Sequence, residues 1–126
     1  MSEQVVSALI GDTYLAMSAE HGLPLLQVQL PDEASSHAAR SGSIERGQRF
    51  VVQGGVAIVP VRGILTPNSA LLEKYLGWAT YHGLAETMAE LEASAEVAAI
   101  VMVYDTPGGT VIGIQAARDA IRSAAA

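Results

Sequence analysis

The feature that most constrains the fold is an unbroken apolar run at residues 97–104, which stops abruptly at the segment 105–109, Asp-Thr-Pro-Gly-Gly. A continuous run rich in β-branched residues is typical of a strand that is buried on both faces of a parallel sheet. Proline followed by two glycines ends such a strand, because proline lacks an N–H and glycine favours turns. We therefore expect a buried strand and then a tight turn at 105–109 that leads into a helix.

Helical patterns lie on both sides of this strand. Before it, apolar residues recur at steps of three or four, at Leu84, Met88, Leu91 and Ala95. Glutamates occupy the opposite face of this predicted helix. After the turn, a second apolar face is formed by Ile114, Ala117, Ile121 and Ala124. Upstream, the pair Gly54-Gly55 predicts a β-hairpin over residues 50–61, in which Pro60 faces an edge or a bulge. The order of hairpin, helix, strand, turn and helix predicts an α/β crossover unit.

The rest of the chain is less regular. Apolar spacing predicts an amphipathic helix at 5–17, an extended stretch at 23–30 and a helical turn at 71–76. Residues 32–48 collect small and polar residues without periodicity and are interpreted as a linker. We therefore divide the chain into an N-terminal helical segment (1–31), a linker (32–48) and part of one α/β domain (49–126).

Composition excludes several classes of function. The formal net charge is −6 and the pI is about 4.8, which argues against a nucleic-acid-binding face and against docking on an anionic membrane. The chain has no cysteine, its three histidines are far apart, and no apolar run is long enough to span a membrane. No Lys or Arg precedes Arg40, unlike the start of a signal peptide. We therefore expect a cytoplasmic protein without a metal, cofactor, nucleic-acid or membrane partner.

The turn at 105–109 is the segment that can carry chemistry. Glycine lets a ligand approach the main chain, and unpaired N–H groups at the start of a helix can stabilise a developing oxyanion. The same glycines also suit a plain connection between strand and helix, which the turn on its own favours. A dinucleotide site is not indicated, because the spaced three-glycine pattern is missing.

Together with their surroundings, these residues resemble a known family. The stretch 55–65 (Gly-Val-Ala-Ile-Val-Pro-Val-Arg-Gly-Ile-Leu), the pair Thr80-Tyr81 before the glutamate-rich helix, and the strand and turn at 97–109 are similar to the protease IV (signal peptide peptidase A) family of serine-lysine peptidases. The similarity is greatest to the phage head-maturation (prohead) protease branch and covers 55–126. It implies a Clp-protease/crotonase-like fold, of which this chain would hold the N-terminal part, a β-hairpin followed by a β-α-β-α unit.

The resemblance also implies roles for individual residues. Gly109, and with it Gly108, would supply backbone N–H groups to an oxyanion hole, and Gly109 is expected to serve catalysis rather than folding. The turn would be shaped by Asp105, Thr106 and Pro107, with Thr106 where the family usually has serine. Near the substrate strand would lie Thr110, Val111, Ile112 and Gly113. The nucleophilic serine and the general-base lysine are expected beyond Ala126, so this chain alone is expected to be inactive.

Residues within the chain offer no replacement for that dyad. Lys74 is the only lysine, and no base stands at a spacing suited to activate Ser69, Ser94 or Ser123. Trp78 is interpreted as a core or interface residue, and His82 as a capping or surface residue.

The resulting hypothesis is the N-terminal portion of a serine endopeptidase that matures phage head proteins. Its partners would be the remainder of the peptidase domain, a peptide or protein substrate and further copies of itself. Two alternatives stay open: an acyl-CoA hydratase or isomerase of the crotonase type, whose oxyanion hole binds a thioester, and a non-catalytic assembly or docking module. The Pro-Gly-Gly turn with its preceding hydroxyl favours the peptidase over the thioester enzymes. A serine-lysine pair downstream would weaken the docking-module hypothesis.

Overall fold

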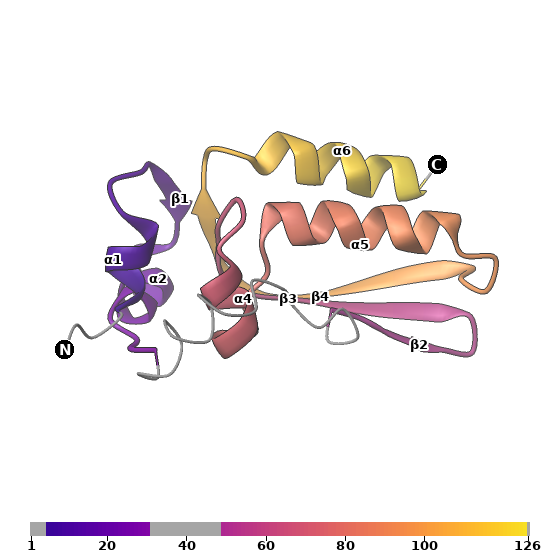
Figure 1. The fold of residues 1–126 in the computed structure, drawn as a ribbon, viewed down its shortest axis with the longest axis horizontal. Coiled ribbons are helices and arrows are strands. Elements are labelled where there is room, and N and C mark those ends of the chain that lie inside the picture. The colour runs from indigo at the N-terminus through magenta and orange to yellow at the C-terminus, as the bar shows by residue number, and fades with distance from the viewer. Residues whose placement is uncertain (1–4, 31–48, 126) are drawn as a thin grey trace.

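The computed structural model describes residues 5–30 and 49–125, which form a mixed α/β structure with one four-stranded sheet and five helices (Figure 1). The strands are β1 (Leu15–Met17), β2 (Val51–Gln53), β3 (Val56–Leu65) and β4 (Ala99–Thr110). The helices are α1 (Val6–Ile10), α2 (Ala19–Leu26), α4 (Ala70–Leu76), α5 (Tyr81–Ala93) and α6 (Ile114–Ala125). The strand order in the sheet is β1-β4-β3-β2. The α/β class predicted from the sequence is confirmed.

The predicted hairpin is present. Strands β2 and β3 pair antiparallel around Gly54 and Gly55, whose φ angles are +58° and +81°. Both angles are positive, as a type I′ two-residue turn requires, and glycine adopts them without a steric penalty. The pairing of β2 ends opposite Ile58, so Pro60 lies where β3 has β4 as its only neighbour within the described residues. The edge position predicted for Pro60 is therefore confirmed.

Strands β3 and β4 run parallel, and the chain between them forms α4 and α5. Helix α5 buries Leu84, Met88 and Leu91 of the predicted apolar face, whereas Ala95 lies after the end of the helix and is exposed. The main apolar cluster consists of Ala57, Val59, Val61, Tyr81, Leu84, Met88, Leu91 and Ala117. Helix α6 lies along α5 on the same side of the sheet (Figure 1). The hydroxyl of Ser123 in α6 donates to the carboxylate of Glu92 in α5 at 2.9 Å, which ties the two helices together at their far ends.

The prediction that β4 is buried on both faces is wrong. Val101 and Val103 remain 49% and 51% exposed, whereas Ile100 and Met102 on the other face pack against the core. The physical reason is that α5 and α6 cover one face of the sheet, and no described element covers the opposite face of β4 at Val101 and Val103. An apolar face of the sheet is therefore left open.

The N-terminal segment also differs from the prediction of one helix followed by an extended stretch. Helix α1 ends at Ile10, because Gly11 takes a φ of +72° at its C-terminus. Residues predicted to continue that helix form β1, and the first half of the stretch predicted to be extended, residues 23–26, lies in α2. Helix α2 begins at Ser18, whose side chain accepts from the N–H of His21. Short-range periodicity missed β1, because its pairing partner lies more than 90 residues away in the sequence.

A second apolar cluster joins the N-terminal segment to β3 and α4. Its buried members are Val6, Leu30, Ile64, Leu72 and Trp78. Trp78 is 8% exposed, which confirms its interpretation as a core residue, and α4 confirms the predicted helical turn. The predicted linker at 32–48 lies outside the described residues. None of the helices in the described residues combines the length and the apolar character that a membrane span requires.

Candidate functional site

The Pro-Gly-Gly segment does not form the predicted tight turn. Strand β4 continues through it to Thr110, because the segment has neighbours on both sides. Gly108 lies opposite Met17 of β1 and Ile64 of β3, and Gly109 lies opposite Ala16 and Leu65. The backbone N–H and C=O groups that a turn would leave without hydrogen bonds are thus part of a sheet. The bend that follows comes at residues 111–113, before α6.

Each glycine allows one neighbouring strand to approach closely. A Cβ placed on Gly108, whose φ is +128°, would lie 2.8 Å from Cα of Met17 in β1. A Cβ placed on Gly109 would lie 2.6 Å from Cβ of Leu65 in β3. Both separations are shorter than side chains tolerate. Gly108 is therefore needed for the approach of β1, and Gly109 for the approach of β3.

The N–H of Gly109 is directed towards β1. The backbone N–H of Ser18 donates to the carbonyl of Pro107 at 2.9 Å, and that of Val111 donates to the carbonyl of Tyr14 at 3.0 Å. Hydrogen-bonded pairs alternate along an antiparallel ladder, so the intervening pair of Ala16 and Gly109 is also a hydrogen-bonded one. The group predicted to stabilise an oxyanion therefore faces a peptide carbonyl of β1.

The hydroxyl of Thr106 makes hydrogen bonds within this segment and to β3. Its Oγ1 accepts a 3.1 Å hydrogen bond from the N–H of Gly108 and donates to the carbonyl of Gly63 in β3. Gly63 has a φ of +73° and lies at the irregularity where the register between β3 and β4 shifts. Asp105 is exposed and shows no side-chain hydrogen bond within the described residues, so its predicted shaping role finds no support.

The four residues predicted to lie near a substrate strand occupy the end of β4 and the following bend. Thr110 is buried, and its carbonyl accepts a 2.7 Å hydrogen bond from the hydroxyl of Tyr81. Burial raises the pKa of Tyr81 above its ordinary value of 10.0, against a smaller opposing effect of this hydrogen bond. Val111 and Ile112 are exposed, and Gly113 packs against Tyr81 with a φ of +94°.

A hollow of about 220 Å³ lies beside this end of β4. Its walls come from three parts of the chain: α1 and the residues after it, the loop before α4, and the end of β4. The lining residues are Leu9, Ile10, Thr13, Thr66, Pro67, Asn68, Ser69, Thr110 and Ile112. The hollow adjoins the segment predicted to contact a substrate and offers mainly apolar and hydroxyl-bearing surface.

The three serines weighed in the predicted domain have different surroundings in the structure. The side chain of Ser69 accepts from the N–H of Leu72 and caps α4, and Ser94 follows the end of α5. Ser123 bonds to Glu92, as described above. The ammonium of Lys74 lies 5.7 Å from the ring centroid of Tyr75. The absence of an internal serine-lysine dyad stays a prediction.

The structure also brings together a serine and a histidine that the sequence analysis did not pair. The Oγ of Ser18 lies 3.2 Å from Nδ1 of His21, at the start of α2 and next to Pro107. The same hydroxyl caps the helix by accepting from the N–H of His21, and both side chains are exposed. No carboxylate orients the imidazole within the described residues, so the pair lacks the third group of a catalytic triad. The sequence signal that could have revealed this pair is the three-residue spacing of Ser18 and His21 at the start of a helix.

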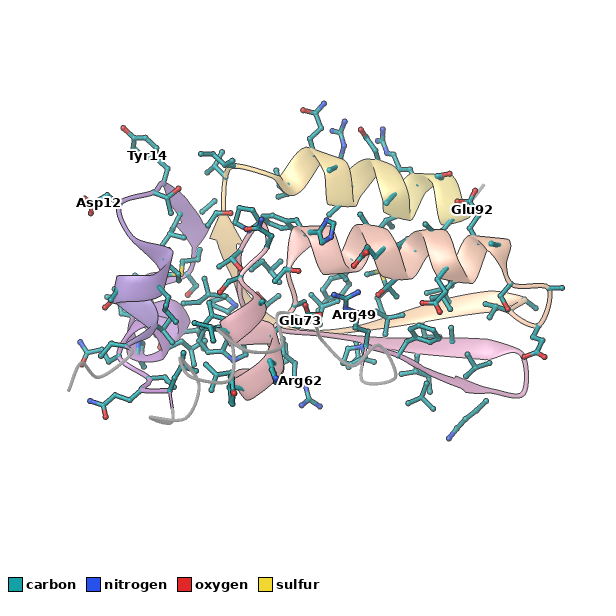
Figure 2. All side chains as sticks on the ribbon, in the orientation of Figure 1. Asp12, Tyr14, Arg49, Arg62, Glu73 and Glu92 are labelled. Atoms are coloured by element: carbon teal, nitrogen blue, oxygen red, sulfur yellow. The ribbon has the colours of Figure 1, made fainter. Side chains whose placement is uncertain are left out.

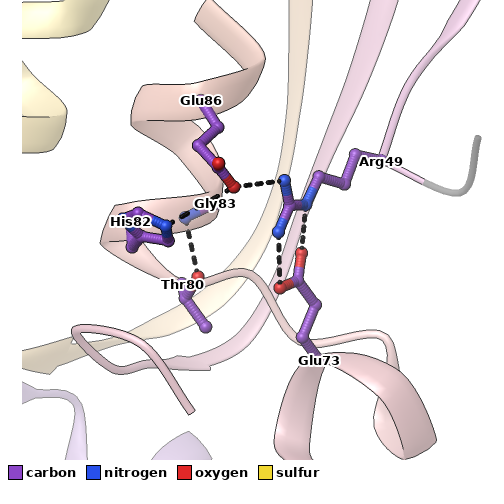
Figure 3. A network of polar contacts seen from close by, with 6 residues as sticks. All are labelled: Arg49, Glu73, Thr80, His82, Gly83 and Glu86. Atoms are coloured by element: carbon purple, nitrogen blue, oxygen red, sulfur yellow. Dashed lines mark hydrogen bonds and ion pairs between the residues drawn. The ribbon is translucent and has the colours of Figure 1, made fainter. Parts of the chain in front are cut away.

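A charge network lies elsewhere and joins Arg49, just before β2, to α4 and α5 (Figure 3). Arg49 makes a two-pronged contact with Glu73, at 2.7 Å from Nε and 3.1 Å from Nη2, and its Nη1 donates to Glu86 at 2.9 Å. Exposed His82 approaches Glu86 at 3.5 Å, which confirms its surface role. A small cavity of about 110 Å³ adjoins Arg49 and Glu73. Because these charges satisfy one another, the network joins elements of the fold and offers no free reactive group.

No group of His, Cys, Asp and Glu suited to hold a metal occurs in the part of the chain that the structure describes. The comparison with known proteins finds a similarity to a phage protein. It is 27% identical over 109 residues to capsid assembly protease C of Escherichia phage lambda, a match that covers 86% of this chain. The chain is a distant relative of a phage capsid assembly protease.

The chain spans 22% of the length of that relative. No family model matches the chain. No solved structure matches it either. The similarity supports the predicted relation to phage head-maturation proteases. The wider protease IV assignment, the Clp-protease/crotonase-like fold and the roles of individual residues stay predictions.

Proposed function

We propose that this chain is the N-terminal portion of a serine endopeptidase that processes phage capsid proteins. The observation that carries the proposal is the similarity to a capsid assembly protease over 109 residues, which includes the Pro-Gly-Gly segment. The geometry is compatible with it, because the N–H of Gly109 lies in register with a peptide carbonyl on the neighbouring strand. A donor so placed can bind a carbonyl oxygen of an extended peptide.

The proposed reaction uses groups outside the described residues. The serine hydroxyl attacks the peptide carbonyl, the lysine amine accepts the hydroxyl proton, and the oxyanion that develops accepts a hydrogen bond from Gly109. The lysine then passes the proton to the leaving amine, and water hydrolyses the acyl-enzyme. This chain would supply the oxyanion donor and part of the substrate groove. The serine and the lysine would lie beyond Ala126.

The open surfaces of the chain fit a larger assembly. Val101 and Val103 present an apolar sheet face, and β4 up to Thr106 has one strand neighbour within the described residues. We propose that the remainder of the peptidase domain covers this face, and that copies of the protein associate. Capsid assembly takes place inside the infected cell, so we place the protein in the cytoplasm.

A non-catalytic docking module is the second candidate, and the same open apolar face is the observation that favours it. The two candidates differ in what the longer protein does. In the test, the protein encoded by the coding sequence read past Ala126 is incubated with a phage scaffold protein, and the chain 1–126 is incubated in parallel.

The proposal predicts cleavage of the scaffold protein by the longer protein and none by the chain alone. Replacement of each downstream serine in turn should identify one whose loss abolishes cleavage. A longer protein that binds the scaffold protein without cleaving it would favour the docking module.

A further inference from the structure

Strand β1 lies where a peptide would have to bind to reach Gly109. We infer that β1 is an internal occupant of a peptide-binding edge of β4, and that an extended peptide binds there by displacing β1. The inference rests on the proposed function, because it concerns how a peptide gains access to the same glycine. It names the ligand class as an extended main chain in antiparallel orientation to residues 107–111.

The first supporting observation is that Gly109 is buried. Gly109 pairs with Ala16 in the antiparallel ladder, and Leu65 of β3 packs against its Cα. A substrate carbonyl cannot contact this N–H while β1 is in place. The strand β3 belongs to the core of the sheet and has β2 on its other side, so β1 is the neighbour that can leave.

The second observation is that the main chain of β1 supplies its bonds to β4. It consists of three residues and forms one end of the sheet, where β4 is its only strand partner among the described residues. The flanking bonds, Ser18 to Pro107 and Val111 to Tyr14, are likewise between backbone atoms. Any extended peptide can make such bonds whatever its side chains, which is the basis of recognition by strand addition.

The third observation concerns the side chains of this segment. Ala16 is exposed, and Tyr14 is 84% exposed and projects away from the sheet (Figure 2). Leu15 and Met17 are half-buried and pack on the second apolar cluster. A displacing peptide would therefore place apolar side chains at two alternate positions, with little restriction at the position between them.

The fourth observation is that the ends of the segment have separate anchors. Val6 in α1 is fully buried, and Leu30 after α2 is 5% exposed. Between Val6 and β1 the chain passes through exposed Asp12 and through Gly11, where an added Cβ would meet no atom within 4 Å beyond the adjoining residues. These anchors allow β1 to leave the edge while the rest of the segment stays packed.

The test uses the full chain and a fluorescent peptide with the sequence of residues 12–19. Ala16→Pro removes the N–H that donates to β4 and adds a ring at an exposed position. Ala16→Ser is the matched control, because it retains the N–H at the same exposed site. Peptide binding is measured by anisotropy, and the protection of the Gly109 amide by hydrogen exchange.

We expect the peptide to bind Ala16→Pro at least about tenfold more tightly than wild type or Ala16→Ser, since β1 no longer competes effectively. The Gly109 amide should lose protection in Ala16→Pro and regain it when peptide is bound. Equal peptide affinity for all three proteins, or a Gly109 amide that stays protected in Ala16→Pro, would overturn the inference. So would an exposed Gly109 amide that the peptide fails to protect.

A global effect of proline is detected in the same spectra by the amides of Val59 and Met88 in the core. If these lose protection, Met17→Ser is measured instead, because it removes an anchoring side chain but keeps every main-chain donor. The same three outcomes then apply to it. None of these readouts requires peptidase activity, so they separate this inference from the proposed function: either can fail while the other holds.

Discussion

The hydroxyl of Tyr81, the first residue of α5, donates a 2.7 Å hydrogen bond to the carbonyl of Thr110, the last residue of β4. Both residues are buried, each at 3% exposure. This bond joins the start of the core helix to the strand that carries Gly108 and Gly109. It therefore holds the end of the candidate site against the main apolar cluster.

Replacing Tyr81 by Phe should lower the free energy of unfolding by about 1–2 kcal/mol, because a buried carbonyl loses its donor. The replacement should also change the response to pH. The folded state raises the pKa of Tyr81 above 10.0, so the fold favours the protonated hydroxyl. This contribution to stability is complete below pH 10.0 and is lost as the pH rises through the folded-state pKa. Urea unfolding at several pH values should show a shallower decline above pH 10 in Tyr81→Phe than in wild type; equal slopes would contradict the prediction.

Gly109→Ala should destabilise the fold by about 1–3 kcal/mol, because the new methyl group would overlap Leu65 of β3. This outcome would differ from the expectation that Gly109 serves catalysis rather than folding. Gly77→Asn is the control, since Gly77 has left-handed angles that Asn accepts and nothing lies within 4 Å of a Cβ there. Thermal unfolding should show a large loss for Gly109→Ala and a small one for the control. Similar melting temperatures for Gly109→Ala and wild type would contradict the prediction, because they would show that β3 shifts to accommodate the methyl group without loss of stability.

Arg49→Met should reduce the free energy of unfolding by about 1.5–3 kcal/mol, because the variant removes the charged partner of Glu73 and keeps the apolar stem. The side chains of Arg49 and Glu73 are only 14% and 11% exposed, so solvent weakens their attraction little. Arg62→Met is the matched control, since Arg62 is an exposed arginine on β3 (Figure 2). Denaturant titrations of the two variants should differ clearly, and losses of equal size would argue that the Arg49 network contributes nothing specific.

The open sheet face predicts self-association of the chain. Light scattering should give a dimer or a larger species, because pairing would cover the exposed valines of β4. The double variant Val101→Lys, Val103→Lys should shift the chain towards the monomer. Ile112→Lys, at a position that is 66% exposed but outside the sheet, should not. A well-folded wild-type monomer at high concentration would count against this prediction.

Local signals in the sequence predicted the elements that depend on neighbouring residues. The Gly54-Gly55 pair set the hairpin turn, and the spacing of Leu84, Met88 and Leu91 marked the buried face of α5. The hydroxyl of Thr106 was expected to bond within its segment, and it does. These features could be predicted because the interacting groups lie close together in the chain.

The features that the sequence did not reveal depend on distant pairing. Nothing near Leu15 indicates a strand, because β1 exists through its contact with the end of β4. The same contact keeps Gly108 and Gly109 extended, where the local pattern predicts a turn. The exposed face of β4 was missed for a related reason: an unbroken apolar run does not show whether a second layer covers it.

The most direct test of the account is to locate the nucleophile with a serine-reactive fluorophosphonate probe. The chain 1–126 and the protein encoded by the coding sequence read past Ala126 are labelled, digested and mapped by mass spectrometry. The account predicts no label on the chain alone and one labelled serine downstream of Ala126 in the longer protein. Stoichiometric label within the chain, at Ser18, Ser69, Ser94 or Ser123, or a longer protein that cleaves a capsid protein without any labelled serine, would contradict it.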